Sequence, residues 1–145
     1  MSRYRQPRLT GRSLVPMAQV RSVFEEPLDG HEIAKGVADD LARHFGDRLE
    51  RVLLYGSWAR GEAHIDSDVD LLVVFSEVRS EDNSFGGPLS ELAGDWFVRG
   101  GRVVSIRAVT DEELNEAART RHPTARDIFL RSARSEAETI FDAAA

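Results

Sequence analysis

The part of the chain that decides the fold is residues 51–75, which read RVLLYGSWARGEAHIDSDVDLLVVF. An apolar run over residues 51–55 stops at Gly56, and a second run, rich in β-branched side chains, covers residues 69–75. Apolar runs of this length bounded by turn residues predict buried strands. We therefore expect two neighbouring strands joined by a small-residue turn and a polar loop.

Helical patterns flank these two strands. Residues 29–45 repeat apolar side chains at intervals of four, which predicts an amphipathic helix that Gly46 ends. The other expected helices run from Pro88 to the glycines at 100–101, over residues 110–119, and onward from Pro123; further strands are expected over residues 102–109 and 139–141. The pattern predicts an α/β (α+β) fold with a small mixed β-sheet flanked by helices.

Composition indicates one domain with a charged N-terminal segment. The chain has 145 residues, 41% of them hydrophobic, and a net charge of -6, which suits a single core. The five charged residues before Glu25 are all arginines, so the rest of the chain carries about -11. We expect residues 1–28 to form a basic, flexible arm, and residues 29–145 to form the folded domain.

The same composition excludes several classes of function. An acidic body argues against nucleic acid as the main partner, because binding the phosphate backbone needs a basic face. The chain has no cysteine, so a metal site must use oxygen or imidazole ligands. No apolar run approaches a membrane span and the N-terminus lacks the apolar core of a signal peptide, so we expect a cytoplasmic protein without a membrane partner.

Asp68 and Asp70 are the candidate metal ligands and catalytic residues. Side chains at i and i+2 of a strand point to the same side, so the two carboxylates converge while Val69 and Leu71 enter the core. Two like charges held this close repel each other, and a divalent cation relieves the repulsion. The pair is typical of a site for Mg²⁺ or Mn²⁺, which is commonly held by one or two carboxylates plus substrate phosphates.

Gly56, Ser57, Arg60 and Ser67 are the candidate nucleotide-binding residues. A chain that turns from a strand into a short helix exposes backbone N–H groups, which together with the Ser57 hydroxyl and Arg60 can hold phosphates. Ser67 is expected to orient Asp68 by local hydrogen bonding. Alone, a glycine-serine turn is usually only a turn, and an Asp-x-Asp pair is usually a solvated strand end. Their combination at two neighbouring strand ends favours a ligand site.

Other nearby side chains leave alternatives open. Trp58 could stack on a base, although packing is the commoner role of a tryptophan beside a strand end. His64 is expected to be a solvated loop residue. Ser105 and Arg107 share strand parity, so both are expected to face the polar side of the sheet.

The chain resembles the minimal nucleotidyltransferases, the antitoxin-like domains of the polymerase-beta-type nucleotidyltransferase superfamily. The resemblance rests on residues 56–62, GSWARGE, and residues 67–71, SDVDL. It implies a nucleotidyltransferase-like fold and transfer of a nucleoside monophosphate from an NTP, expected to be ATP, to a hydroxyl. Asp68 and Asp70 would hold the metal, and Gly56 and Ser57 the β and γ phosphates.

The resemblance also frames three functional hypotheses. One is an antitoxin that transfers AMP to a companion HEPN-type ribonuclease toxin. Active members usually add a third carboxylate from a later strand, and here that position falls near Ser105, with Asp95, Asp111 and Glu112 as possible substitutes. A second hypothesis is therefore a catalytically impaired nucleotide-binding or partner-binding module. The third is a small-molecule transferase that completes its acceptor pocket as a homodimer.

Overall fold

The centre of the molecule is a four-stranded mixed sheet with strand order β3-β2-β1-β4. A computed structural model describes residues 15–22 and 25–145. The strands are β1 (Leu49–Tyr55), β2 (Val69–Phe75), β3 (Val104–Val109) and β4 (Glu138–Asp142). β1 pairs antiparallel with β2 and β4, while β2 and β3 run parallel. The predicted α/β class with a small mixed sheet is confirmed.

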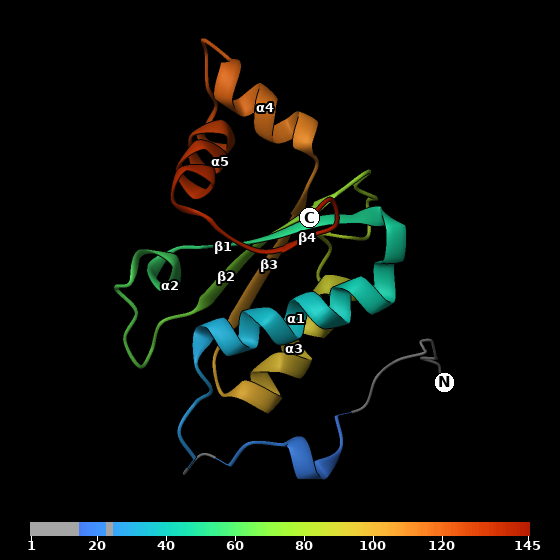
Figure 1. Cartoon of the computed structure of the whole chain (residues 1–145), viewed down its shortest axis with the longest axis vertical. Coiled ribbons are helices and arrows are strands. Elements are labelled where there is room, and N and C mark those ends of the chain that lie inside the picture. The colour runs from blue at the N-terminus through green and yellow to red at the C-terminus, as the bar shows by residue number, and fades with distance from the viewer. Residues whose placement is uncertain (1–14, 23–24) are drawn as a thin grey trace.

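Helices cover the sheet on both sides (Figure 1). They are α1 (Gly30–Phe45), the single-turn α2 (Ser57–Arg60), α3 (Pro88–Gly100), α4 (Asp111–Arg119) and α5 (Ala125–Glu136), with short 3₁₀ turns η1 (Met17–Gln19) and η2 (Gly46–Arg48). α1 and α3 pack on one face of the sheet, and α4 and α5 pack together on the other. The helices begin and end close to the predicted positions.

The helix ends follow the expected capping chemistry. The Asp29 carboxylate accepts hydrogen bonds from the backbone N–H groups of His31 at 2.8 Å and Glu32 at 3.4 Å, which starts α1. Thr110 and Glu113 form a capping box at the start of α4. These caps satisfy N–H groups that the first turn leaves without helical partners.

The alternation along β2 divides its side chains between two cores. Leu71 and Val73 are fully buried against the α1 and α3 side. Leu72 and Val74 are equally buried on the other side, under α4 and α5. Asp70 belongs to the second row by parity, but it lies nearer the start of β2 and is only partly covered. The strand that fills the core therefore also presents a carboxylate at its end.

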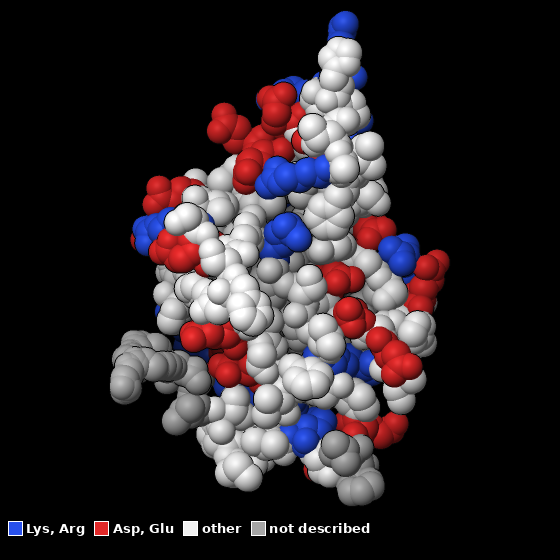
Figure 2. All heavy atoms as spheres, turned by 180° about the vertical axis from the view of Figure 1, so that it is seen from behind, with Lys and Arg blue, Asp and Glu red and all other residues white. Residues whose placement is uncertain are grey.

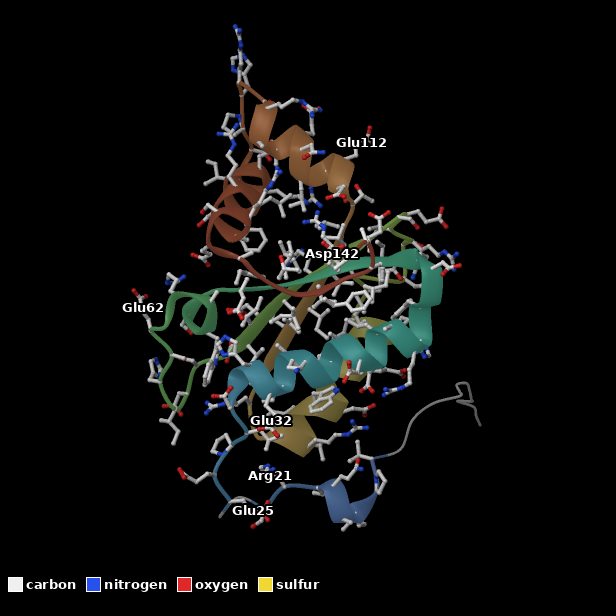
Figure 3. The ribbon with its side chains drawn as sticks, in the orientation of Figure 1. Arg21, Glu25, Glu32, Glu62, Glu112 and Asp142 are labelled. Atoms are coloured by element: carbon white, nitrogen blue, oxygen red, sulfur yellow. The ribbon has the colours of Figure 1, made fainter. Side chains whose placement is uncertain are left out.

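The described part of the N-terminal arm contacts α3. The Arg21 backbone N–H donates to the Val98 carbonyl and its Nε to the Arg99 carbonyl, both at 2.9 Å. Figure 3 shows Arg21 near Glu25, to which it is ion-paired at 3.5 Å. The remaining arginines of the arm lie outside the described residues, so its flexibility stays a prediction. Within the described chain, no helix has the length and apolar character needed to cross a bilayer.

Candidate active site

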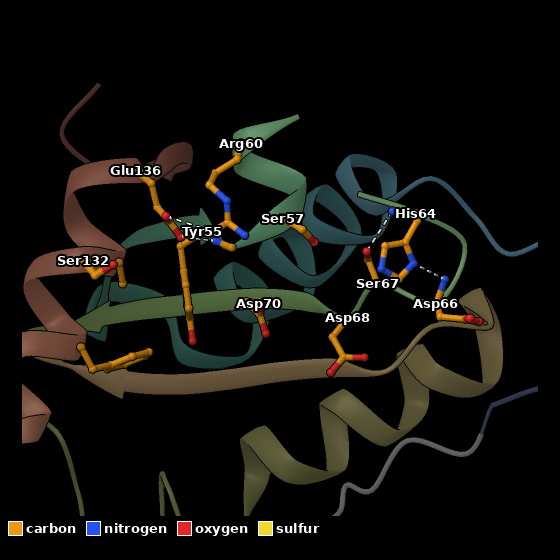
Figure 4. Close-up of a pocket in the computed structure, with 13 residues that line it drawn as sticks. Tyr55, Ser57, Arg60, His64, Asp66, Ser67, Asp68, Asp70, Ser132 and Glu136 are labelled. Atoms are coloured by element: carbon orange, nitrogen blue, oxygen red, sulfur yellow. Dashed lines mark hydrogen bonds and ion pairs between the residues drawn. The ribbon is translucent and has the colours of Figure 1, made fainter. Parts of the chain in front are cut away.

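A cavity of about 470 Å³ opens where β1 ends and β2 begins (Figure 4). Three segments line it: residues 55–57 and 60, residues 64, 66–68 and 70, and residues 129, 132, 133 and 136 of α5. All six predicted site residues are among them: Gly56, Ser57, Arg60, Ser67, Asp68 and Asp70. The fold thus brings the phosphate-binding candidates and the carboxylates to one cavity.

Gly56 connects β1 to α2 in a conformation that favours glycine. Its φ of 80° lies in the region that side chains with a Cβ rarely adopt. A Cβ at this position would also collide with the Asp70 carboxylate. The close approach of this turn to Asp70 therefore requires glycine for two separate reasons.

The turn offers hydrogen-bond donors to the cavity. Ser57 lines the cavity, and within the described part of the chain no hydrogen bond satisfies its backbone N–H or uses its hydroxyl. Because α2 has only four residues, its dipole is small, and these individual donors matter more than the helix does.

Asp68 and Asp70 project from the same side of β2, as their spacing predicts (Figure 4). Asp68 is exposed just before the strand, and Asp70 is half-buried within it. Val69 between them is fully buried, which fixes the backbone that carries both carboxylates. Two carboxylates that project from the same side of a fixed backbone can bind one cation together.

The electrostatics of Asp70 indicate a site that would accept a cation. Burial raises the pKa of Asp70 above its ordinary value, and the charges of Asp68 and Glu136 raise it further, with a partial offset from Arg60. Among the described residues, no cluster of three or more acidic or histidine side chains could hold a metal by itself. Two oxygen ligands completed by substrate phosphates suit Mg²⁺ or Mn²⁺, so the donor set fits the expected metal.

Glu136, the last residue of α5, is the site residue that sequence reasoning missed. Its carboxylate accepts a hydrogen bond from the Gly56 N–H at 2.6 Å and pairs with Arg60 at 3.0 Å. Arg60 also donates to Glu62 at 2.9 Å. The arginine expected to bind phosphate is therefore already paired with two carboxylates. The one available signal was a glutamate at a helix C-terminus, where a negative charge is unfavourable.

Ser67 holds the loop that precedes β2. Its hydroxyl accepts a hydrogen bond from the His64 N–H at 2.9 Å, and its own N–H donates to the His64 carbonyl at 3.0 Å. The Ser67 side chain is buried, whereas His64 is exposed, as expected. These reciprocal bonds fix the backbone next to Asp68.

Ser105 lies beside Asp70 on the neighbouring strand. The two residues are partners in the parallel pairing of β2 and β3, and Tyr55 is the partner of Asp70 on the other side. Burial and the Asp70 charge raise the pKa of Tyr55 to about 12, although Arg107 and the Ser105 hydroxyl act against the shift. The three alternative carboxylates, Asp95, Asp111 and Glu112, do not line the cavity.

Trp58 packs against the protein. Its ring joins the core beside α1, close to Gly30, where a Cβ would collide with it. The Arg102 guanidinium lies 4.9 Å from the ring centroid, and His31 makes an edge contact at 6.1 Å. These contacts favour the packing role over base stacking.

A mixed sheet with a glycine turn after β1 and two aspartates at the start of β2 is the arrangement that the resemblance to nucleotidyltransferases predicts. The sequence model of the nucleotidyltransferase domain matches residues 34–126, which is more than half of the chain. The chain belongs to the nucleotidyltransferase domain family, as the resemblance predicted. The match includes Gly56, Asp68, Asp70 and Ser105, and ends before Glu136.

The chain is also similar to individual proteins, over a short segment or at low sequence identity. A segment of 47 residues, 32% of this chain, is 43% identical to a protein of Methanocaldococcus jannaschii named "Putative protein adenylyltransferase", and spans 48% of that protein, about half its length. A solved structure described as "a putative nucleotidyltransferase from Sulfolobus solfataricus" aligns over 79% of this chain and 81% of its own, with 21% identity and a TM-score of 0.48. Another, described as "the toxin-antitoxin with AMP-PNP", aligns over 70% and 82%, with 20% identity and a TM-score of 0.42.

Proposed function

We propose that this protein is a metal-dependent nucleotidyltransferase that transfers AMP from ATP to a hydroxyl of a partner protein. The observation that carries the proposal is that Asp68 and Asp70 lie on one side of β2 and share a cavity with the turn at Gly56. Family membership supports the reaction class. The name of the M. jannaschii relative supports a protein as the acceptor.

Each candidate residue has a specific role in this proposal. The N–H groups and hydroxyl of the turn, with Arg60, hold the β and γ phosphates of the nucleotide. Asp68 and Asp70 would hold Mg²⁺ or Mn²⁺, which when bound neutralises negative charge on the phosphates. Ser67 keeps the loop before Asp68 in place through its bonds to His64.

The rate of this reaction depends mainly on how the acceptor hydroxyl and the nucleotide are positioned. The acceptor oxygen bonds to the α-phosphorus while the bond from that phosphorus to the leaving pyrophosphate breaks, and the hydroxyl loses its proton. The protein contributes by aligning the two reactants and by placing charge where the transition state develops it. The backbone that carries Asp68 and Asp70 suits this task, since the buried Val69 between them anchors it before the nucleotide binds.

One observation favours a second candidate function, nucleotide binding without turnover. Ser105 is the β3 partner of Asp70, and a hydroxyl there cannot supply the charge of a third carboxylate. A module of this kind would bind a metal-nucleotide complex and release no pyrophosphate.

An assay of label transfer separates the two functions. The purified chain is incubated with Mg²⁺ or Mn²⁺ and α-labelled ATP, CTP, GTP or UTP, with and without the product of the neighbouring gene, a HEPN-type toxin if one is encoded there. We expect transfer from ATP to a protein, reduced at least about 100-fold by Asp68→Asn or Asp70→Asn. Asp39→Asn removes an exposed charge outside the cavity and serves as the control.

The outcomes of this assay are distinct. Transfer that persists in the Asp68 and Asp70 variants contradicts the proposed roles. Metal-dependent ATP binding without pyrophosphate release under any condition favours the binding module instead.

A further inference from the structure

Glu136 occupies the groups that the proposed function assigns to phosphate. Its Oε2 accepts the Gly56 N–H at 2.6 Å, and Arg60 Nη1 lies 3.0 Å from Oε1 and 3.1 Å from Oε2. The side chain reaches from the end of α5 toward Arg60 and the cavity, as Figure 4 shows, and is 21% exposed. A carboxylate of the protein thus sits where an anionic ligand is expected.

A carboxylate and a phosphate compete for the same kind of donors. Both present anionic oxygens, and both form charge-assisted hydrogen bonds with a backbone N–H and a guanidinium. Because the single Gly56 N–H cannot fully serve two anions at once, a nucleotide phosphate that binds it has to release Glu136. Glu136 is tethered beside these donors, so it competes at a high effective concentration.

The local structure gives no other reason for a glutamate here. A negative charge in the last turn of α5 interacts unfavourably with the partial charge at that end of the helix. It also lies near Asp70, whose pKa it helps to raise. The favourable contacts of Glu136 are those with Gly56 and Arg60, and they compensate for both penalties.

We propose that Glu136 is an internal competitor of the β and γ phosphates: it occupies Gly56 and Arg60 in the free protein, and a metal-bound triphosphate displaces it. The inference rests on the proposed function, because it takes Gly56 and Arg60 as phosphate ligands. A triphosphate offers several anionic oxygens and a metal that Asp68 and Asp70 attract. AMP lacks the β and γ phosphates that Gly56 and Arg60 are proposed to hold, so its binding does not require the displacement of Glu136.

Calorimetric titration with ATP, and separately with AMP, each with Mg²⁺, tests this inference on the full chain. We expect Glu136→Gln to bind ATP at least tenfold more tightly than wild type, and to bind AMP with an affinity within twofold of that of wild type. Glu138→Gln is the matched control, because it removes the same charge two residues away. Its carboxylate bonds to His31 at 2.9 Å and does not line the cavity, so we expect a change below twofold.

A second variant separates the two contacts of Glu136. Glu62 pairs with Arg60 at 2.9 Å but has no hydrogen bond to Gly56. We expect Glu62→Gln to tighten ATP binding less than Glu136→Gln does, since it leaves the Gly56 N–H occupied. An equal effect of both variants overturns the assignment of Gly56 as the contested donor.

A measurement on the unmodified protein covers the case in which Glu136→Gln does not fold. In NMR titrations of labelled wild type with ATP and Mg²⁺, we expect the Gly56 amide and the Glu136 side-chain carboxyl resonances to move together. ATP binding that leaves the Glu136 resonance unmoved, or that is unchanged or weaker in a folded Glu136→Gln variant, overturns the inference alone. Failure of wild type and all variants to bind any nucleotide overturns the proposed function and the inference with it.

Discussion

At the scale of single residues, Gly56 tests whether the turn and Asp70 act together. Gly56 and Gly61 both have positive φ, 80° and 72°, but a Cβ collides with Asp70 only at position 56 and meets nothing within 4 Å at position 61. Gly61→Ala costs about 1–2 kcal/mol of backbone strain, because Gly61 has a left-handed helical conformation. Gly56, with a ψ of -157°, has a conformation essentially confined to glycine, so Gly56→Ala costs about 1–3 kcal/mol and also displaces a candidate metal ligand. We expect Gly56→Ala to weaken binding of ATP with Mg²⁺ at least tenfold, and Gly61→Ala to leave it within twofold.

Calorimetry and thermal unfolding of the two glycine variants separate strain from collision. Weaker ATP binding by Gly56→Ala alone, at a temperature where both variants stay folded, supports the contact between Gly56 and Asp70. If both variants bind ATP alike, this contact is irrelevant to the ligand.

Substitution of Ser105 tests whether the lack of a third carboxylate limits the reaction rate. A side chain at 105 stands beside Asp70 across the parallel pairing of β2 and β3. We expect Ser105→Asp to increase pyrophosphate release at least tenfold, because it adds negative charge near the two aspartates that would hold the metal. Ser105→Asn, of similar size without the charge, is the control. Equal rates in the Asp and Asn variants would show that the charge at this position does not limit turnover.

Local spacing and burial explain which site residues could be predicted. Asp68, Asp70 and Gly56 lie within fifteen positions, and strand alternation alone places both carboxylates on one side. Glu136 reaches Gly56 from 80 positions away, and no local pattern encodes that approach. The same carboxylate also pairs with Arg60, so the arginine expected to bind phosphate is already ion-paired.

At the scale of elements, capping and periodicity give the boundaries, while packing decides the neighbours. Residues 110–113 contain both partners of the α4 capping box, so its start follows from sequence alone. The position of β4 beside β1 depends on contacts between distant segments. α5 becomes part of the site because Leu130 and Ala133 pack on the sheet and bring its last turn to the cavity. Such long-range packing cannot be predicted from any single short segment of the sequence.

At the scale of the whole molecule, the cavity and a buried ion pair lie at opposite ends of the central strands. Arg48 precedes β1 and pairs with Asp82 at 2.9 Å and 3.0 Å, while the cavity lies where β1 ends. Asp82 is 1% exposed, and Arg48 lies 4.3 Å from the centroid of the Phe75 ring. On the face seen in Figure 2, acidic and basic side chains are interspersed. The ion pair of Arg48 and Asp82 and the charges that line the cavity are therefore separate groups.

This separation predicts a pH-dependent stability that does not involve the site. Burial alone would raise the pKa of Asp82, but the Arg48 hydrogen bonds and the Arg79 N–H outweigh it and hold the pKa below its ordinary value. The unfolded chain, with a pKa of about 3.9 at this residue, therefore binds the proton more readily. The stability that Asp82 contributes is complete above about pH 4 and is lost as the pH falls through the lower pKa of the folded state.

Asp82→Asn removes this contribution and leaves Arg48 buried without its partner. We expect the free energy of unfolding at pH 7 to fall by about 3 kcal/mol, and the loss of stability between pH 5 and pH 2 to become shallower than in wild type. Denaturant unfolding at several pH values measures both effects, with Asp47→Asn, an exposed neighbour, as the control. Affinity for ATP, measured where the variant remains folded, should stay within twofold of wild type, because the pair lies at the far end of β1 from the cavity. Equal pH profiles for the two variants would contradict the proposed role of Asp82, since of these two carboxylates only that of Asp82 is buried against a cation.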